Sequence, residues 1–183
     1  MRRYFFISAA VLALDQVSKY ASVAFLFGKQ SVPVMPFFDL TLVYNSGASA
    51  LIRWLVEATI GVFSDDVFFW QRWLLTVVSL AASVLLVVWI RRLEPKDVRL
   101  AISFSLILGG AVGNLIDRVL LGYVIDFIDI YYRGRDCFWV FSPSNGNCHW
   151  PAFNVADSAI TVGAILLVLD ALGWNPWEKH RVS

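Results

Sequence analysis

Residues 100–118 read LAISFSLILGGAVGNLIDR, an uncharged apolar stretch that ends in polar residues, and this stretch decides the fold. Residues 100–116 carry no charge, and about 20 apolar residues are enough for a helix to cross a bilayer. Asp117 and Arg118 follow directly. Because a charged side chain at membrane depth is costly, its presence there indicates a functional site or an ion pair. The sequence therefore predicts a membrane helix with a polar site at one end.

The composition agrees with a membrane protein. Of the 183 residues, 58% are hydrophobic and 16% are charged, whereas a soluble domain is about half apolar and a quarter charged. The net charge of +1 and the lack of a basic patch give no reason to expect a nucleic acid partner. We expect a single membrane-embedded domain over residues 1–183.

Three further apolar stretches complete a set of four predicted spans. The spans lie at about 4–27, 71–91, 100–121 and 155–173, and long connections occupy 28–70 and 122–154. Lys and Arg gather before the first span, between the second and third, and after the fourth. Basic flanks mark the cytoplasmic side. Both termini are therefore expected in the cytoplasm, and the two long connections outside.

The chain start, MRRYFF, is also typical of a cleaved secretory leader, which is the alternative to a first span. Asp15 and Lys19 interrupt the apolar core that such a leader needs. These two residues lie four positions apart, so on a helix they share a face and can form an ion pair. We therefore expect a retained first span.

The long connections are expected to form a small outer β-structure. β-Branched and aromatic residues predict a strand at 38–44, and alternation of side chains predicts another at 124–131. Turn residues and prolines predict irregular chain at 33–36 and a loop at 142–147. Residues 48–62 are expected to form a helix on the membrane surface.

A polar stripe runs along the third span, where Gly110, Gly113, Asn114 and Asp117 share one helix face. Packing of neighbouring helices explains the glycines, since small residues let membrane helices approach closely. It does not explain Asn114 and Asp117. Asp117 is either a site acid or half of a structural ion pair, for which Arg118 is a candidate partner.

A second stripe begins the fourth span with Asn154, Asp157, Ser158 and Thr161. Asn154 is either a plain helix N-cap or a site residue, and the pattern leaves both open. Asp157 falls in the first turn, where the helix dipole favours a negative charge.

Paired carboxylates suggest a reaction. Two acids in one site cannot both ionise easily, so the pair retains one proton, and such a pair can hydrolyse an amide with water. This chemistry requires no metal, cofactor or covalent nucleophile. A Ser-His-Asp triad fits less well, because His149 and His180 lie in a loop and in a tail.

Cys137 and Cys148, the only two cysteines, both fall in the second outer connection. An even count on an oxidising side favours a disulfide, and two free thiols are the alternative.

Five separated segments resemble those of the lipoprotein signal peptidases (signal peptidase II). In order, they are DQVSK at 15–19, NSGA at 45–48, GGAVGNLIDR at 109–118, VIDFI at 124–128 and FNVAD at 153–157. The resemblance implies an all-α membrane protein with four transmembrane helices, a small extracytoplasmic β-cradle and a surface helix. The stretch 132–150 looks longer than is common in that family.

The same resemblance implies an aspartic endopeptidase of the bacterial cytoplasmic membrane. It would cleave diacylglyceryl-prolipoproteins before the lipidated cysteine, and we expect it to act as a monomer among membrane lipids. The catalytic pair would be Asp126 and Asp157. The supporting polar residues would be Asp15, Lys19, Asn45, Gly47, Asn114, Asp117, Arg118, Asn154 and Ala156. Spacing alone does not favour Asp126 over Asp117.

Two other functions use the same residues. A proton-coupled transporter would place acids along a route to both membrane faces, whereas Asp117, Asp126 and Asp157 gather toward the outer side. A non-catalytic assembly or chaperone protein would bind lipid-anchored chains and would keep all its activity after Asp126→Asn.

Overall fold

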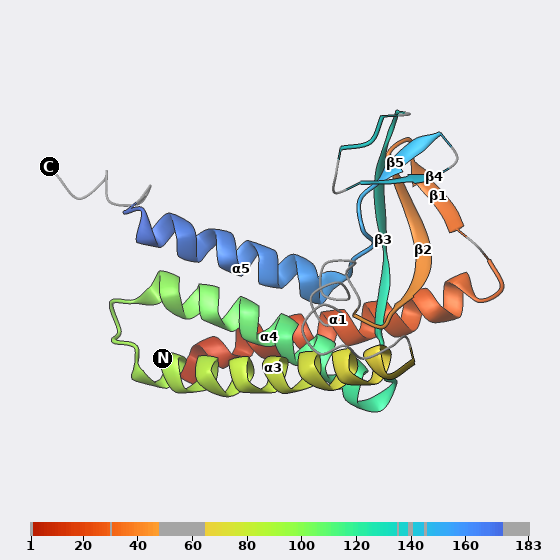
Figure 1. Ribbon diagram of the computed structural model, residues 1–183. Helices are drawn as coiled ribbons and strands as arrows, with labels where there is room; N and C mark the ends of the chain where they lie inside the picture. Colours follow the sequence, from red (N-terminus) through yellow and green to blue (C-terminus); the bar gives the residue numbers. More distant parts are fainter. Residues whose placement is uncertain are drawn as a thin grey trace, which may run out of the picture.

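The computed structural model describes residues 2–29, 31–47, 65–134, 136–138, 141–144 and 146–173. A short 3-10 turn, η1, precedes the first of four long helices. The elements are η1 (Arg2–Tyr4), α1 (Phe5–Leu26), α3 (Asp65–Arg92), α4 (Val98–Leu120) and α5 (Val155–Ala171). Within the described chain, α1, α4 and the Arg72–Arg92 part of α3 are long and apolar enough to cross a membrane. The helices run alongside one another, and a sheet stands across one end of them (Figure 1).

The central helix is α4, which contacts α1, α3 and α5. Small residues on α4 allow the close approach. A Cβ on Gly110 would collide with the carbonyl oxygen of Ala156 in α5, and one on Gly109 would lie 2.8 Å from the Ser8 carbonyl oxygen in α1. On the α3 side, Leu108 packs with Leu86 and Ile90. The glycines predicted to form a packing face therefore do so.

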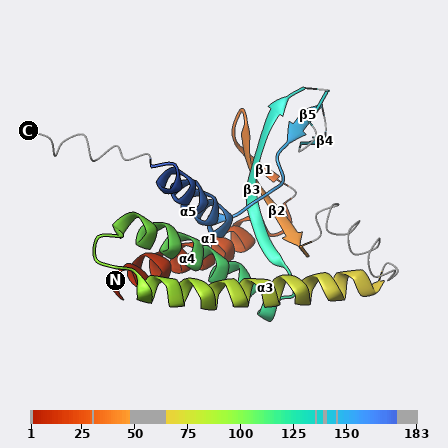
Figure 2. The same cartoon turned by 60° about the vertical axis from the view of Figure 1, so that its left-hand side comes forward.

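The sheet has five antiparallel strands in the described chain, in the order β1-β2-β3-β5-β4. The strands are β1 (Ser31–Met35), β2 (Phe38–Asn45), β3 (Val124–Arg133), β4 (Ser142–Ser144) and β5 (Asn147–His149). β1 follows α1, β3 follows α4, and α5 follows β5, so the sheet lies where three helices end or begin (Figure 2). Arg72 of α3 fixes the α4 end of this junction by donating hydrogen bonds to the carbonyl oxygens of Arg118 and Val119, at 3.2 and 3.3 Å.

The strands predicted at 38–44 and 124–131 are confirmed as β2 and β3. Two other predictions for the outer connections were wrong. Most of the predicted irregular stretch 33–36 belongs to β1, an edge strand of the described sheet, where a proline is tolerated because one side has no partner strand among the described residues. The predicted loop at 142–147 overlaps the short hairpin β4–β5, whose strands occupy 142–144 and 147–149. The sheet is thus larger than the sequence indicated, and the fold is less purely helical. The predicted surface helix at 48–62 lies outside the described residues.

Candidate active site

Asp126 and Asp157 lie close together because Asn154 binds both. Asp126 lies near the start of β3 and is 1% exposed. The Asn154 side-chain amide donates to Asp126 Oδ1 at 2.7 Å, and the Asn154 backbone N–H donates to Asp157 Oδ2 at 3.3 Å. Of the four candidate acids, these two therefore share one site at the junction of the sheet and α5.

Asn154 is also the N-cap of α5. Its Oδ1 accepts from the Asp157 backbone N–H at 2.9 Å, which completes a capping box. The N-cap alternative for Asn154 is confirmed, and the cap also fixes the side chain so that its NH2 group faces Asp126. Ser158 and Thr161 of the same predicted stripe do not join the site, since their hydroxyls donate to carbonyl oxygens of their own helix.

Asn114 holds the second acid from α4. Its Nδ2 donates to Asp157 Oδ1 at 2.7 Å, and its Oδ1 accepts from Lys19 Nζ at 3.0 Å. The amide orientation follows from these partners, because only the oxygen can face the ammonium group. Asn114 thus links Lys19 in α1 to Asp157 in α5.

Lys19, Asp15 and Asp117 form a buried ion cluster beneath the two acids. Lys19 Nζ lies 2.8 Å from Asp15 Oδ2 and 2.8 Å from Asp117 Oδ2, and all three side chains are at most 3% exposed. The predicted Asp15–Lys19 pair is confirmed. Among the described residues, Asp117 forms an ion pair with Lys19 and not with Arg118. Asp15 Oδ1 also accepts from the Ala156 backbone N–H at 2.9 Å, which anchors the first turn of α5.

The Arg118 guanidinium has N–H donors that form no hydrogen bond to the described residues. Its Nη1 lies 3.5 Å from the Asn114 carbonyl oxygen, a weak contact, and its buried Nε has no partner among the described residues. Within the same residues it forms no ion pair, although it feels the charges of Asp157 and Asp126. It is therefore a cation beside the acids with hydrogen-bonding capacity left for another molecule.

Asn45 completes the site from β2. Its Nδ2 donates to Asp126 Oδ2 at 2.9 Å, and its Oδ1 accepts from the Gly47 backbone N–H at 2.8 Å. Gly47 has a positive φ of 91°, which favours glycine, and a Cβ there would collide with the Leu75 side chain. Both residues therefore serve to hold Asn45 in place against Asp126.

Sequence analysis assigned no role to Gln16, yet this residue belongs to the ion cluster. Its Nε2 donates to Asp117 Oδ1 at 3.0 Å and lies 3.2 Å from Asp15 Oδ2. The available signal was a polar side chain inside an apolar span, three positions before Lys19, which places it on a neighbouring part of the same helix face.

Burial is the main influence on the Asp126 carboxyl. All influences together raise the pKa of Asp126 from 3.8 to about 7, and burial is the largest of them. The hydrogen bond from Asn45 opposes this rise, and the negative charge of Asp157 contributes to it. Asp126 is thus able to keep a proton near neutral pH.

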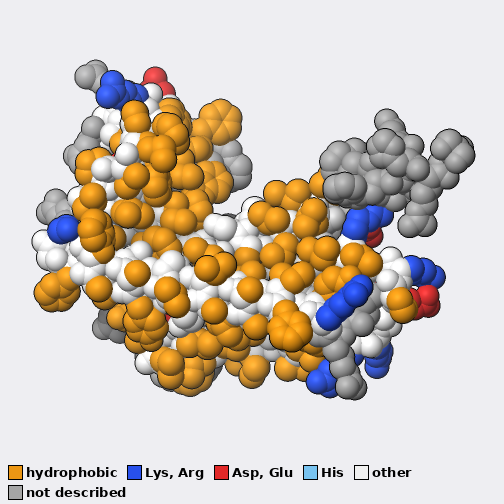
Figure 3. All heavy atoms as spheres, turned by 180° about the vertical axis from the view of Figure 1, so that it is seen from behind, with side chains coloured by type: hydrophobic (Ala, Val, Ile, Leu, Met, Phe, Trp, Pro, Cys, Tyr) orange, Lys and Arg blue, Asp and Glu red, His pale blue; other side chains and the backbone are white. Residues whose placement is uncertain are grey.

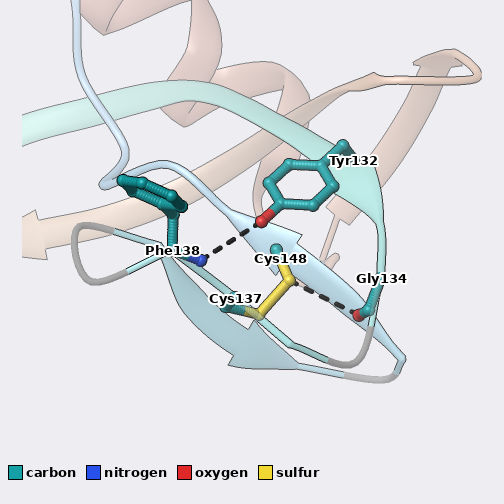
Figure 4. Close-up of a disulfide and its surroundings, with 5 residues drawn as sticks. All are labelled: Tyr132, Gly134, Cys137, Phe138 and Cys148. Carbon is teal, nitrogen blue, oxygen red and sulfur yellow. Dashed lines mark hydrogen bonds between the residues drawn. A yellow bond between two sulfur atoms is a disulfide. The ribbon is translucent and has the colours of Figure 1, made fainter.

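The structure joins Cys137 and Cys148 by a disulfide, as predicted (Figure 4). The bond lies at the distal end of the sheet, where Cys148 is paired with Tyr132, whereas the acids lie at the opposite end of β3. It is therefore separate from the acid cluster.

Comparisons with known proteins point to one family. A family model described as signal peptidase (SPase) II matches residues 7–173. A lipoprotein signal peptidase of Pseudomonas syringae pv. tomato is 45% identical over 168 residues, 91% of this chain and 84% of that protein. One of Alteromonas mediterranea is 39% identical over 168 residues, 92% of this chain and 79% of that protein.

Two solved structures, both described as bacterial membrane enzymes determined by the in meso method, are similar in fold. Each shares 28% sequence identity with this chain. One, at 2.3 Å resolution, has a TM-score of 0.66 and covers 100% of this chain and 94% of its own. The other, at 1.9 Å, has a TM-score of 0.68 and covers 96% of each. Together with the family match over most of its length, these similarities show that the chain belongs to the signal peptidase II family.

Proposed function

We propose that this chain is a membrane aspartic endopeptidase that removes the signal peptide from diacylglyceryl-modified prolipoproteins, cleaving before the lipidated cysteine. The names of its relatives support the substrate class. The aspartic mechanism depends on one observation: Asn154 hydrogen-bonds both Asp126 and Asp157 and so holds two carboxyls in a single site.

The two acids divide the work of hydrolysis. Asp126, whose pKa is about 7, holds the proton, and Asp157 is the ionised partner in the first turn of α5. Asp157 takes a proton from a water molecule, whose oxygen attacks the peptide carbonyl carbon. Asp126 gives its proton to the carbonyl oxygen. Collapse of the tetrahedral intermediate breaks the C–N bond and forms the new carboxyl group. One of its hydroxyls returns a proton to Asp126, and the proton held by Asp157 passes to the leaving nitrogen, so both acids regain their starting states.

The position of the acids suits a lipid-anchored substrate. They lie where α4 passes into the sheet and where α5 begins, which corresponds to the head-group region at one end of the spans. The free donors of Arg118 are placed to bind a carbonyl oxygen of the substrate.

We further propose that α5 is the fourth span and that the protein is a monomer of the bacterial cytoplasmic membrane. Both termini would lie in the cytoplasm and the sheet outside. The 17 residues of α5 give a length of about 25 Å, slightly short of a typical hydrocarbon core. The close packing of α5 on α4 supports this assignment. A transporter is less well supported, because Asp170, at the far end of α5, is paired with Arg99 at 2.9 Å.

Cleavage of a purified, lipidated precursor in detergent tests the proposal. Asp126→Asn and Asp157→Asn should each abolish cleavage and leave precursor binding largely intact. The matched control is Asp129→Asn, because Asp129 lies on the same strand but faces away from the acids and pairs with His149. Near-normal turnover in either site variant would refute the aspartic mechanism. A precursor without the diacylglyceryl group should be cut poorly, and equal rates would refute the substrate assignment.

A further inference from the structure

The strand β3 sorts its side chains onto two faces of the sheet. Side chains alternate along a strand, so Ile130 and Tyr132 lie on the same face as Asp126. Tyr132 is paired with Cys148 on β5. The Trp150 backbone N–H donates to the Ile130 carbonyl oxygen at 2.8 Å, which continues this pairing by one step. The face that carries the catalytic acid therefore continues outward as an apolar surface.

We call this distal surface the aromatic platform, and it comprises Ile130, Tyr132, Phe138, Phe141 and Trp150. Phe141 packs edge-on against Tyr132 at 5.0 Å and against Trp150 at 5.4 Å. Phe138 is 70% exposed, and its backbone N–H donates to the Tyr132 hydroxyl at 3.3 Å. Figure 4 shows that the disulfide holds Cys137 and Phe138 over this face of the sheet. Among the described residues, four of the five side chains of the platform are exposed: Ile130, Tyr132, Phe138 and Trp150.

The opposite face of the same strands is polar. His149 Nδ1 lies 2.9 Å from Asp129 Oδ2, and the Tyr131 hydroxyl donates to Asp39 Oδ1 at 3.2 Å. Ser144, whose neighbour on β5 is Asn147, belongs to this polar face. The distal sheet is thus amphipathic, although both faces are outside the helical bundle.

The platform lies on the face of the sheet that is turned toward the start of α5. Asp126, on the same face, meets Asn154 at the start of α5, and the sheet stands across the ends of the helices (Figures 1 and 2). In Figure 3, hydrophobic atoms cover both the sheet and the helices on the two sides of a hollow. The sheet and the helices therefore both present apolar surface on the two sides of this hollow.

We propose that the aromatic platform rests in the head-group region of the outer leaflet beside α5, so that lipid is its partner. Tyr and Trp combine an apolar ring with a polar group, which favours the membrane–water interface. Exposed apolar area of this kind marks an interaction site, and here it lies on the side of the sheet from which the apolar helices extend. The contact supports the distal end of the sheet whose other end carries Asp126. It involves lipid as a surface and not as a substrate.

Photo-crosslinking in the full-length protein tests this contact. The variants Phe138→p-benzoylphenylalanine and Ser144→p-benzoylphenylalanine place the same photoreactive group on opposite faces of the distal sheet. In nanodiscs of phosphatidylethanolamine and phosphatidylglycerol, illumination should give severalfold more lipid adduct from position 138, measured by mass spectrometry. Equal lipid labelling at both positions, or adducts at position 138 to a second copy of the chain, would overturn the proposal.

Trp150 gives a second readout that needs no photoreactive group. Its emission is isolated as the difference between the wild type and Trp150→Phe. Lipids brominated near the head-group end of the acyl chain should quench this emission more strongly than lipids brominated near the chain end. Absence of quenching by either lipid would also overturn the proposal. Neither readout depends on cleavage, so a failure here is distinguishable from failure of the proposed enzyme activity.

Discussion

Lys19 is a buried lysine whose ammonium has three partners: Asp15 at 2.8 Å, Asp117 at 2.8 Å and Asn114 at 3.0 Å. Three N–H donors therefore meet three acceptors, as a buried ammonium group requires. An unpaired charge in such a place costs about 3–5 kcal/mol, so the cluster is stable only as a complete set. Through Asn114, the cluster also determines which atom faces Asp157. One cation in α1 thus organises an acid in α5.

The pH dependence of cleavage should report the Asp126 proton. Because the Asp126 pKa is raised to about 7, the carboxyl is protonated below that pH and loses its proton above it. Cleavage by a protonated Asp126 should therefore be lost as the pH rises through neutrality, with the rate falling about tenfold per pH unit. A profile of kcat against pH measures this limb.

Asn45→Ala is the informative control for that profile. Asn45 donates to the ionised carboxylate and so lowers the Asp126 pKa. Removing this donor should move the alkaline limb to higher pH. If the pH at which kcat falls is the same in Asn45→Ala as in the wild type, a group other than Asp126 controls the rate.

At the scale of elements, the contact between α4 and α5 determines where Asp157 lies. Gly110 packs directly against the Ala156 backbone, one residue before Asp157. Gly110→Ala should push the two helices apart, destabilise the protein by about 1–3 kcal/mol and reduce cleavage. Thermal unfolding in detergent and the cleavage rate measure the two effects.

Ala164→Leu is the matched control for the glycine variant, because Ala164 is exposed on the outer side of α5 and lines an open apolar groove. Its added volume should change neither unfolding nor cleavage. If Gly110→Ala behaved like Ala164→Leu, the α4–α5 contact would not control the site.

Helices and long strands were predictable because their signals are local. The apolar spans, β2, β3 and the Asp15–Lys19 pair all follow from composition or spacing over a few residues. β1 and the β4–β5 hairpin were missed because their pairing depends on partners distant in the sequence. The partner of Asp117 was open for a related reason, since it depends on how α1 is rotated against α4. The choice of Asp126 came from the family resemblance, because spacing does not encode which acid meets Asp157.

At the scale of the whole molecule, the site draws on five elements. Asp15 and Lys19 come from α1, Asn45 from β2, Asn114 from α4 and Asp126 from β3, while Asp157 lies in α5. No single one of these five elements carries both acids and the residues that hold them. The acids are therefore in place only when the bundle and the sheet are both assembled.

The disulfide should act locally within this assembly. The double variant Cys137→Ser/Cys148→Ser should lose about 2–3 kcal/mol of hairpin stability, because a short loop is no longer closed. Hydrogen exchange should rise in residues 141–150, while cleavage in detergent should persist. Asp126 is held by Asn45 and Asn154 at the other end of β3. A loss of cleavage as large as that of Asp126→Asn would mean that the disulfide also holds the acids in place.

Helix capping and catalysis place unequal demands on position 154. Serine and aspartate cap a helix about as well as asparagine, so α5 itself would tolerate any of the three. Only asparagine among them carries an NH2 group that can reach Asp126 while its oxygen caps the helix. A chain with serine or aspartate there would fold with a well-formed α5 and an acid pair without its bridge. Substitution of Asn154 by serine or aspartate should therefore preserve the stability of the fold and reduce cleavage.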